Sequence, residues 1–181
     1  MLAGGASRRM GRAKAFIEID GLPMAVAATQ ALEAGGARPT VIVGGAQDRV
    51  EALGLEWVAD EFPGEGPLGG VITAIRHHRA VADGIVILPC DLLYPSPDAV
   101  RALAEALDAS VVAVPVVDGR PQWVHAAWRV DALPVLEAAF GDGVRAIRHA
   151  IDPIDVAMVS GGHPDWYVDA DSPDDLPSET R

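Results

Sequence analysis

The stretch LAGGASRRMGRAK, residues 2–14, joins a glycine turn to a run of cationic side chains. Gly4 and Gly5 let the backbone approach a ligand because neither carries a Cβ. Backbone N–H groups in such a turn can hold a phosphate, Arg8 can bind its oxygens with a guanidinium fork, and Lys14 can add a point charge. The pattern is neither a Walker A loop nor GxGxxG. It predicts an anion site of another kind, with a solvated basic turn as the simple alternative.

The charge around this stretch differs from that of the rest of the chain. The chain has 26 acidic residues against 14 lysines and arginines, a formal net charge of −12, whereas residues 1–17 contain four cations and no acid. A surface this negative argues against non-specific binding to nucleic acid or to an anionic membrane. We therefore expect no nucleic-acid and no membrane partner, and a local anion site near the start of the chain.

Length and composition predict one globular domain. The chain has 181 residues, half of them apolar, so we expect a single domain over residues 1–181. No apolar run approaches the roughly 18 residues of a membrane span, and the first residues lack the apolar core of a secretory signal. The single cysteine, Cys90, excludes an intrachain disulfide. The expected location is cytoplasmic.

Short apolar runs alternate with stretches of helical periodicity. Continuous Val- and Ile-rich runs are typical of strands covered on both faces, and apolar residues at i, i+3, i+4 and i+7 are typical of helices. The expected strands are 40–43, 84–88 and 110–114, and the expected helices are 68–75, 100–107 and 133–140. The alternation predicts a three-layer α/β domain with a mostly parallel sheet. Ligands of such sheets bind at the carboxyl ends of the strands.

The strand that leads into the glycine turn is unusually short. The turn begins at Gly4 after only three residues, whereas strands are usually about five residues long. Either the first strand has two or three residues, or the true start lies upstream. We describe it as apparently truncated.

Asp91 is the strongest candidate for a metal ligand. It follows an apolar strand and a proline, so its carboxylate is expected at the carboxyl end of the sheet. Mg²⁺ prefers oxygen ligands and is usually held by one or two carboxylates together with substrate phosphates. The alternative role, capping the next helix, suits Ser96 better because that helix begins further along the chain.

Four segments together resemble the molybdenum cofactor guanylyltransferases, part of a wider group of nucleotidyltransferases. Residues 2–15 resemble the signature loop, EGPLGG at 65–70 the GPLxG turn, and LPCD at 88–91 the PCD metal motif. DADSPDDL at 169–176 is similar to the closing N-x-N-T-P-E-D-L. The order is the same, and the resemblance spans residues 1 to about 176. It implies a three-layer, Rossmann-like nucleotidyltransferase domain.

The resemblance implies transfer of GMP from GTP to the phosphate of molybdopterin, with molybdenum bound. The products would be the guanine dinucleotide form of the cofactor and pyrophosphate, and the ion would be Mg²⁺. Arg8, Lys14 and Asp91 would be catalytic, which fits the need of phosphoryl transfer for charge neutralisation and in-line positioning. Expected partners are GTP, molybdopterin, and the proteins that insert molybdenum or mature molybdoenzymes.

The resemblance also implies which residues contact the nucleotide. A carboxylate at Asp60 could accept two hydrogen bonds from N1–H and the exocyclic amine of guanine, a pair that cytosine does not offer. Asp60 could instead be an ordinary loop acid beside Glu61. The expected nucleotide-binding residues are Leu2, Ala3, Gly4, Gly5, Lys14, Gly44, Asp60, Gly66 and Asp91.

A second metal carboxylate is expected near the C-terminus, from either Asp169 or Asp171. The segment that follows, 172–175, has the pattern of a helix cap, and both roles are compatible. The family pattern has asparagines where this chain has the two aspartates, which look more like those of the cytidylyltransferase relatives. A CTP-using enzyme on the same acceptor therefore stays open.

The second half of the chain offers acceptor-side candidates. By resemblance, Trp123 could stack on a pterin, and Arg120 and Arg145 could meet a phosphate. The five histidines have no zinc-like spacing, and the pair at 77–78 is expected on a helix surface. Two alternatives remain: transfer to another phosphorylated acceptor, and a non-catalytic nucleotide-binding protein. Asp91 and Lys14 together argue against the second.

Overall fold

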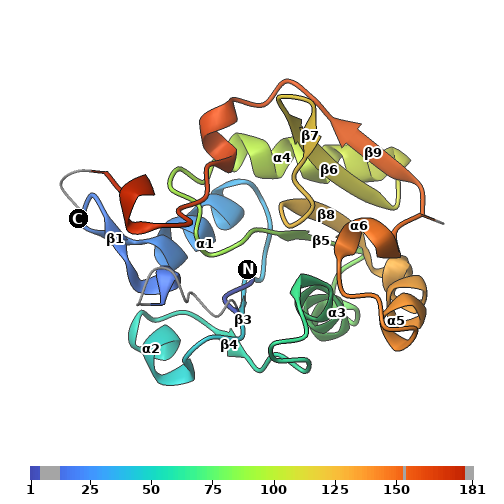
Figure 1. Ribbon diagram of the computed structural model, residues 1–181, viewed down its shortest axis with the longest axis horizontal. Coiled ribbons are helices and arrows are strands. Elements are labelled where there is room, and N and C mark those ends of the chain that lie inside the picture. The colour runs from blue at the N-terminus through green and yellow to red at the C-terminus, as the bar shows by residue number, and fades with distance from the viewer. Residues whose placement is uncertain (5–12, 153, 178–181) are drawn as a thin grey trace.

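The computed structural model describes residues 1–4, 13–152 and 154–177. Figure 1 shows the strands β5 (Gly84–Ile87) and β8 (Ala126–Arg129) between the helices α4 (Pro97–Ala106) and α3 (Pro67–His78). The helices are α1 Met24–Ala34, α2 Gln47–Ala52, α3 Pro67–His78, α4 Pro97–Ala106, α5 Leu133–Gly141 and α6 Ile147–Ala150. The strands are β1 Glu18–Ile19, β2 Leu22–Pro23, β3 Ile42–Val43, β4 Trp57–Val58, β5 Gly84–Ile87, β6 Val112–Val117, β7 Arg120–Pro121, β8 Ala126–Arg129 and β9 Val156–Val159.

Short 3₁₀ turns complete the described chain: η1 Lys14–Phe16, η2 Leu107–Ala109, η3 Val130–Ala132, η4 Pro164–Tyr167 and η5 Pro173–Asp175. The expected strands and helices are present with shifted ends. Ser96 caps α4 as expected, since its Oγ accepts from the N–H of Asp98 at 3.2 Å. No helix among the described residues is long and apolar enough to cross a membrane.

The sheet is mixed, so the expectation of a mostly parallel sheet is wrong. β3 pairs with β4 in parallel and β6 with β9 in parallel, but β8 lies antiparallel to both β5 and β6. Only residues 118–125, which include the short β7, separate β6 from β8. A parallel return needs a crossover of a dozen or more residues, so the chain re-enters the sheet in the opposite direction.

The first three residues form a short strand in the centre of the sheet. Leu2 bridges in parallel to Val43 on one side and to Pro89 on the other. Its N–H donates to the carbonyl of Leu88 at 2.9 Å, and its carbonyl accepts from Cys90 at 3.0 Å. This pairing joins β3 to β5 and places Gly4 at the carboxyl ends of both strands.

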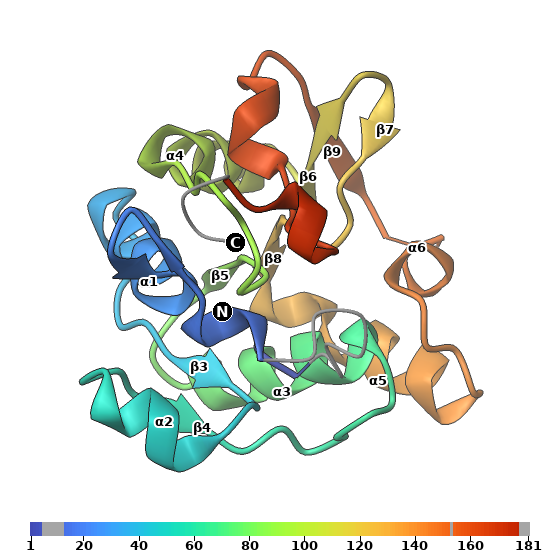
Figure 2. The same cartoon turned by 60° about the vertical axis from the view of Figure 1, so that its left-hand side comes forward.

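Each face of the sheet packs against its own helices, which gives the three layers expected. Alternate strand residues such as Val43 and Ile87 pack with α3 and α5, and the intervening ones such as Ile42 and Leu88 pack with α1 and α4. The period of two along a strand explains this division. In Figure 2 the segment after β5 and the C-terminal segment meet near the N-terminus, at one end of the sheet.

Candidate active site

A cavity of about 930 Å³ at the carboxyl ends of the central strands collects most of the expected site residues. They come from five segments that are distant in the sequence, which the sheet brings together. The lining includes Leu2, Ala3, Gly4, Lys14, Asp60, Gly66, Asp91, Trp123, Asp169 and Asp171. Gly5 and Arg8 lie outside the described residues, so their roles stay predictions.

Lys14 joins two of the expected carboxylates. Its Nζ donates to Oδ2 of Asp91 at 2.8 Å and to Oδ1 of Asp171 at 3.0 Å. Burial of the ammonium lowers the pKa of Lys14, but the hydrogen bonds to the two aspartates outweigh burial and raise that pKa above its ordinary value. Lys14 therefore stays charged at neutral pH.

Backbone hydrogen bonds hold the C-terminal aspartates beside Asp91. The N–H of Leu93 donates to Val168, and the N–H of Ala170 donates to the carbonyl of Asp91, both at 2.9 Å. Asp169 and Asp171 are two residues apart in this extended segment. Each contacts a different partner inside the cavity.

The cap expected at residues 172–175 is also present. Oδ2 of Asp175 accepts from the N–H groups of Asp171 and Ser172, at 2.9 and 2.6 Å. These hydrogen bonds lower the pKa of the Asp175 carboxyl. The cap fixes the backbone that carries Asp171, so the cap and the ligand role are compatible in this fold.

The donor set fits a divalent cation completed by substrate oxygens. Oxygens of Asp91 and Asp171 both lie within 3.0 Å of one cationic nitrogen, which shows that they converge on a position suited to positive charge. Over the described ranges no cluster of three or more His, Cys, Asp or Glu side chains could hold a metal alone. Two carboxylates plus phosphates is the arrangement usual for Mg²⁺.

Asp60 lines the same cavity, beside Gly4. Its Oδ1 accepts from the N–H of Phe62 at 2.9 Å and contacts the hydroxyl of Thr73 at 3.4 Å. Its Oδ2 has no hydrogen-bond partner within the described part of the chain, and it lies 3.2 Å from the place of a Cβ on Gly4. One carboxylate oxygen is thus anchored and the other faces the space beside the glycine turn.

Two glycines of the site are required by their surroundings. Gly44 has φ +76°, and a Cβ there would come within 3.3 Å of the Gly4 Cα. Gly66 has φ +88° where α3 begins, and a Cβ there would meet the carbonyl of Arg145 at 3.3 Å. Gly44 supports the wall of the cavity from behind, while Gly66 lies in the lining itself.

The three acceptor-side candidates differ in whether they line the cavity. Trp123 lines the cavity, whereas Arg120 and Arg145 do not. Arg145 binds Oε2 of Glu65 at 2.6 Å and lies over the ring of Phe140 at 4.0 Å, so it ties the turn before α3 to the end of α5. Arg120 is exposed on β7. Their roles toward an acceptor stay predictions.

The sequence did not single out His125, which is 2% exposed in the wall of the cavity. Its Nε2 lies 3.4 Å from Oδ1 of Asp169, and its Nδ1 is buried without a partner among the described residues. No spacing signal points to it, because its neighbour Asp169 is distant in the sequence. Cys90 also lines the cavity, and burial raises the pKa of its thiol to about 12.

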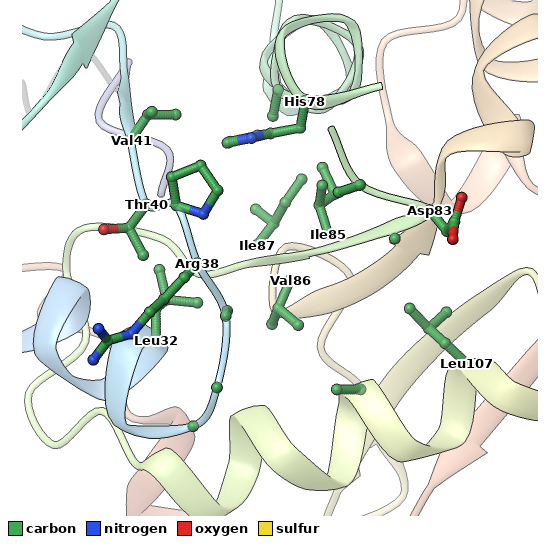
Figure 3. A pocket seen from close by; sticks show the side chains of 18 of the residues that line it. Leu32, Arg38, Thr40, Val41, His78, Asp83, Ile85, Val86, Ile87 and Leu107 are labelled. Carbon is green, nitrogen blue, oxygen red and sulfur yellow. The ribbon is translucent and has the colours of Figure 1, made fainter. Parts of the chain in front are cut away.

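A second cavity, of about 360 Å³, lies at the amino ends of β3 and β5. Figure 3 shows its apolar walls from β5, with Leu107 on one side and His78 on another. His78 is only 8% exposed, so the expectation of a surface pair at 77–78 is wrong for this residue. None of the expected site residues lines this cavity.

Comparison with known proteins decides the family. Residues 1–156 match the MobA-like NTP transferase domain. The chain belongs to this family. A molybdenum cofactor guanylyltransferase from Rhizobium rhizogenes is 31% identical to it over 191 residues, covering 97% of this chain and 87% of that protein. A probable molybdenum cofactor guanylyltransferase from Opitutus terrae is 43% identical over 93 residues, 51% of this chain and 46% of that protein.

Solved structures agree with this family fold. The molybdopterin-guanine dinucleotide biosynthesis protein A of Archaeoglobus fulgidus superposes with a TM-score of 0.78 at 22% identity, covering 97% of this chain and 92% of that one. A Mycobacterium tuberculosis protein solved in complex with manganese gives a TM-score of 0.68 at 19% identity, covering 96% and 92%. This MobA-like chain thus shares the mixed α/β nucleotidyltransferase fold.

Proposed function

We propose that this MobA-like chain transfers GMP from GTP to the phosphate of molybdopterin, yielding the guanine dinucleotide cofactor and pyrophosphate. The observation that carries the proposal is the convergence of Lys14, Asp91 and Asp171 in the cavity that also contains Asp60. Family membership and the activity named for the Rhizobium rhizogenes relative support the same assignment.

The reaction needs no protein nucleophile. An oxygen of the acceptor phosphate, already ionised, forms a bond to the α-phosphorus of GTP, and the bond from that phosphorus to the β-phosphate oxygen breaks. Pyrophosphate leaves with the electron pair. The thiol of Cys90 stays protonated because of its raised pKa, which leaves it unsuited to attack. Lys14, together with Arg8, would stabilise charge on the phosphates.

Asp91 and Asp171 would hold the magnesium ion. The ion, when bound, neutralises charge on the phosphates of the nucleotide. Asp171 is favoured over Asp169 as the second ligand because Asp171 shares a cation with Asp91, whereas Asp169 contacts His125. A protein of the same fold was solved in complex with manganese, a divalent cation.

Asp60 would select guanine through its Oδ2. That oxygen faces the cavity, while Oδ1 is anchored by Phe62. Cytosine does not offer the paired N1–H and exocyclic amine of guanine, so the Asp60 carboxylate would lose these hydrogen bonds. An unpaired carboxylate is costly in a partly desolvated site. Gly4 and Gly66 would let the nucleotide approach the backbone closely.

A product assay tests the proposal. The purified protein is incubated with Mg²⁺, molybdopterin and each nucleoside triphosphate in turn, and the product is identified by mass. The guanine dinucleotide formed from GTP is the expected result. The cytosine dinucleotide formed from CTP would instead establish the cytidylyltransferase alternative, and no dinucleotide from any triphosphate would contradict the acceptor or the activity.

A further inference from the structure

Lys14 is the only lysine in the sequence, and its ammonium contacts the two carboxylates proposed to hold the metal. The side chain is 13% exposed, and that of Asp91 is 20% exposed. Asp171 is 63% exposed, so the group opens to solvent on one side. The ammonium therefore acts as an internal counter-ion in the structure described here.

The ammonium and a divalent cation compete for the same oxygen atoms. Oδ2 of Asp91 and Oδ1 of Asp171 both accept from Nζ, so a metal ion bound by these oxygens would lie close to the ammonium. Two cations a few ångströms apart repel each other strongly in a partly desolvated site. A bound metal ion and Lys14 in its present position are therefore incompatible.

A displaced ammonium needs another anion. Within the described ranges, no third carboxylate lies at ion-pair distance from Nζ. Ala3, Gly4 and Gly66 line the same cavity as Lys14, and its volume of about 930 Å³ leaves room for a ligand's phosphates. A nucleoside polyphosphate is the anion that this cavity would bring within reach of the lysine.

We propose that Lys14 couples metal binding to nucleotide binding. Without either ligand it neutralises Asp91 and Asp171, and on ligand binding it moves to the phosphates of the nucleotide and releases these oxygens to the metal ion. The inference rests on the proposed function, which supplies the nucleoside triphosphate and the divalent cation. Because such coupling is reciprocal, each ligand strengthens binding of the other by the same factor.

The coupling is tested by measuring the affinity for Mn²⁺ with and without GTP. The paramagnetic resonance signal of free Mn²⁺ gives the amount of ion that is not bound. For the wild type, GTP should raise the Mn²⁺ affinity by about fivefold or more. For Lys14→Met, Mn²⁺ alone should bind about tenfold more tightly than to the wild type, because a charge-assisted competitor is gone. The enhancement by GTP should then largely disappear.

Arg76→Met is the matched control. Arg76 also joins two carboxylates, Glu61 and Glu137, but it does not line the cavity. The change in net charge is the same, and wild-type metal binding is expected. Lys14→Arg keeps a cation at the site, so Mn²⁺ alone should still bind weakly to this variant. It provides a second test if Lys14→Met does not fold.

The single lysine allows a direct observation in the wild type. Protein labelled with ¹³C-lysine gives one side-chain set of signals, from Lys14. GTP with Mg²⁺ should shift the Cε signal, whereas guanosine, which has no phosphate, should not. Equal shifts with guanosine and GTP, or a Lys14→Met variant with unchanged metal affinity and intact enhancement by GTP, would overturn the proposal.

These measurements need no acceptor, so their result is separate from the proposed activity. If the coupling is found but no GMP is transferred to molybdopterin, the proposed activity fails and the role of Lys14 stands. If GMP is transferred while Lys14→Met keeps the full coupling, the role of Lys14 fails and the activity stands.

Discussion

The two cavities lie at opposite ends of the same central strands and differ in what lines them. The carboxyl-end cavity gathers charged side chains from distant segments, among them Lys14, Asp60 and Asp91. The amino-end cavity (Figure 3) has Ile85 and Ile87 in its walls, and the charged residues Arg38 and Asp83 also line it. A cavity in this fold is therefore not by itself a site, and the ion pairs that join Lys14 to Asp91 and Asp171 distinguish the carboxyl-end cavity.

The cause of the difference lies in the direction of the central strands. Leu2, β3 and β5 run in parallel, so the segments that follow them emerge at one edge. At that edge Gly4, the Asp60 loop and the Asp91 loop lie together, as is usual for ligand sites of such sheets. The opposite edge receives the ends of α1 and α3, and the segments that follow these two helices line the amino-end cavity.

The largest effect that would sharpen the comparison is expected from Asp91→Asn. Loss of a metal carboxylate should lower kcat by about a thousandfold or more, since the ion contributes several kcal/mol to charge stabilisation. Steady-state kinetics and a thermal unfolding curve measure the two quantities needed. Near wild-type turnover together with an unchanged melting temperature would remove Asp91 from the metal role.

Asp60→Ala should abolish most of the preference for GTP over CTP. The preference is expected to be about 10²-fold, because the wrong base leaves a hydrogen-bonding group unpaired. Competition binding of the two triphosphates to wild type and variant measures it. Equal affinities in the wild type would favour the cytidylyltransferase alternative and would show that Asp60 does not select the base.

Lys14→Ala should lower kcat by about tenfold to a hundredfold while changing KM for GTP less. Charge on the leaving oxygen grows only in the transition state, where a fixed ammonium contributes most. Initial rates over a range of GTP concentrations separate the two constants. A raised KM with unchanged kcat would mark uniform binding instead.

His78, which lines the amino-end cavity, should affect the stability of the fold but not catalysis. Burial, with a contribution from His77, lowers the pKa of His78 in the folded protein. Below about pH 6.5 the unfolded chain therefore binds a proton that the folded chain does not, and the free energy of unfolding falls as pH drops.

His78→Gln tests this assignment. The variant should show a weaker dependence of unfolding on pH between about 5 and 7, with kcat within about twofold of the wild type. Denaturant titrations at several pH values, with the exposed His163→Gln as control, measure it. A large loss of activity in His78→Gln would assign this end of the sheet a catalytic role and break the comparison.

The sequence predicted the carboxyl-end site better than it predicted the sheet. Asp91 could be placed because it follows a strand and a proline, and the Asp169–Asp171 segment because a cap pattern comes directly after it. The sequence could not predict that β8 runs antiparallel to its neighbours, because an apolar run has the same composition in either strand direction. His125 was missed for a related reason: its importance depends on Asp169, a neighbour only in space.

Some residues make contacts in the structure that differ from those expected from the sequence. Arg145 was expected near a phosphate, but in the structure its guanidinium binds Glu65 and lies over Phe140. His78 was expected at the surface because the helical pattern does not show that the turn before β3 covers it. Such contacts form between segments that are distant along the chain, and the sequence of neither segment indicates that the two pack together.

The position of a bound metal ion tests the account most directly. A crystal of the protein grown with Mn²⁺ and a non-hydrolysable GTP analogue would place the manganese by its anomalous scattering. The account predicts a peak between Asp91 and Asp171, the guanine beside Asp60, and Lys14 at the phosphates. Manganese and nucleotide at the amino-end cavity, or manganese in contact with neither Asp91 nor Asp171, would contradict it.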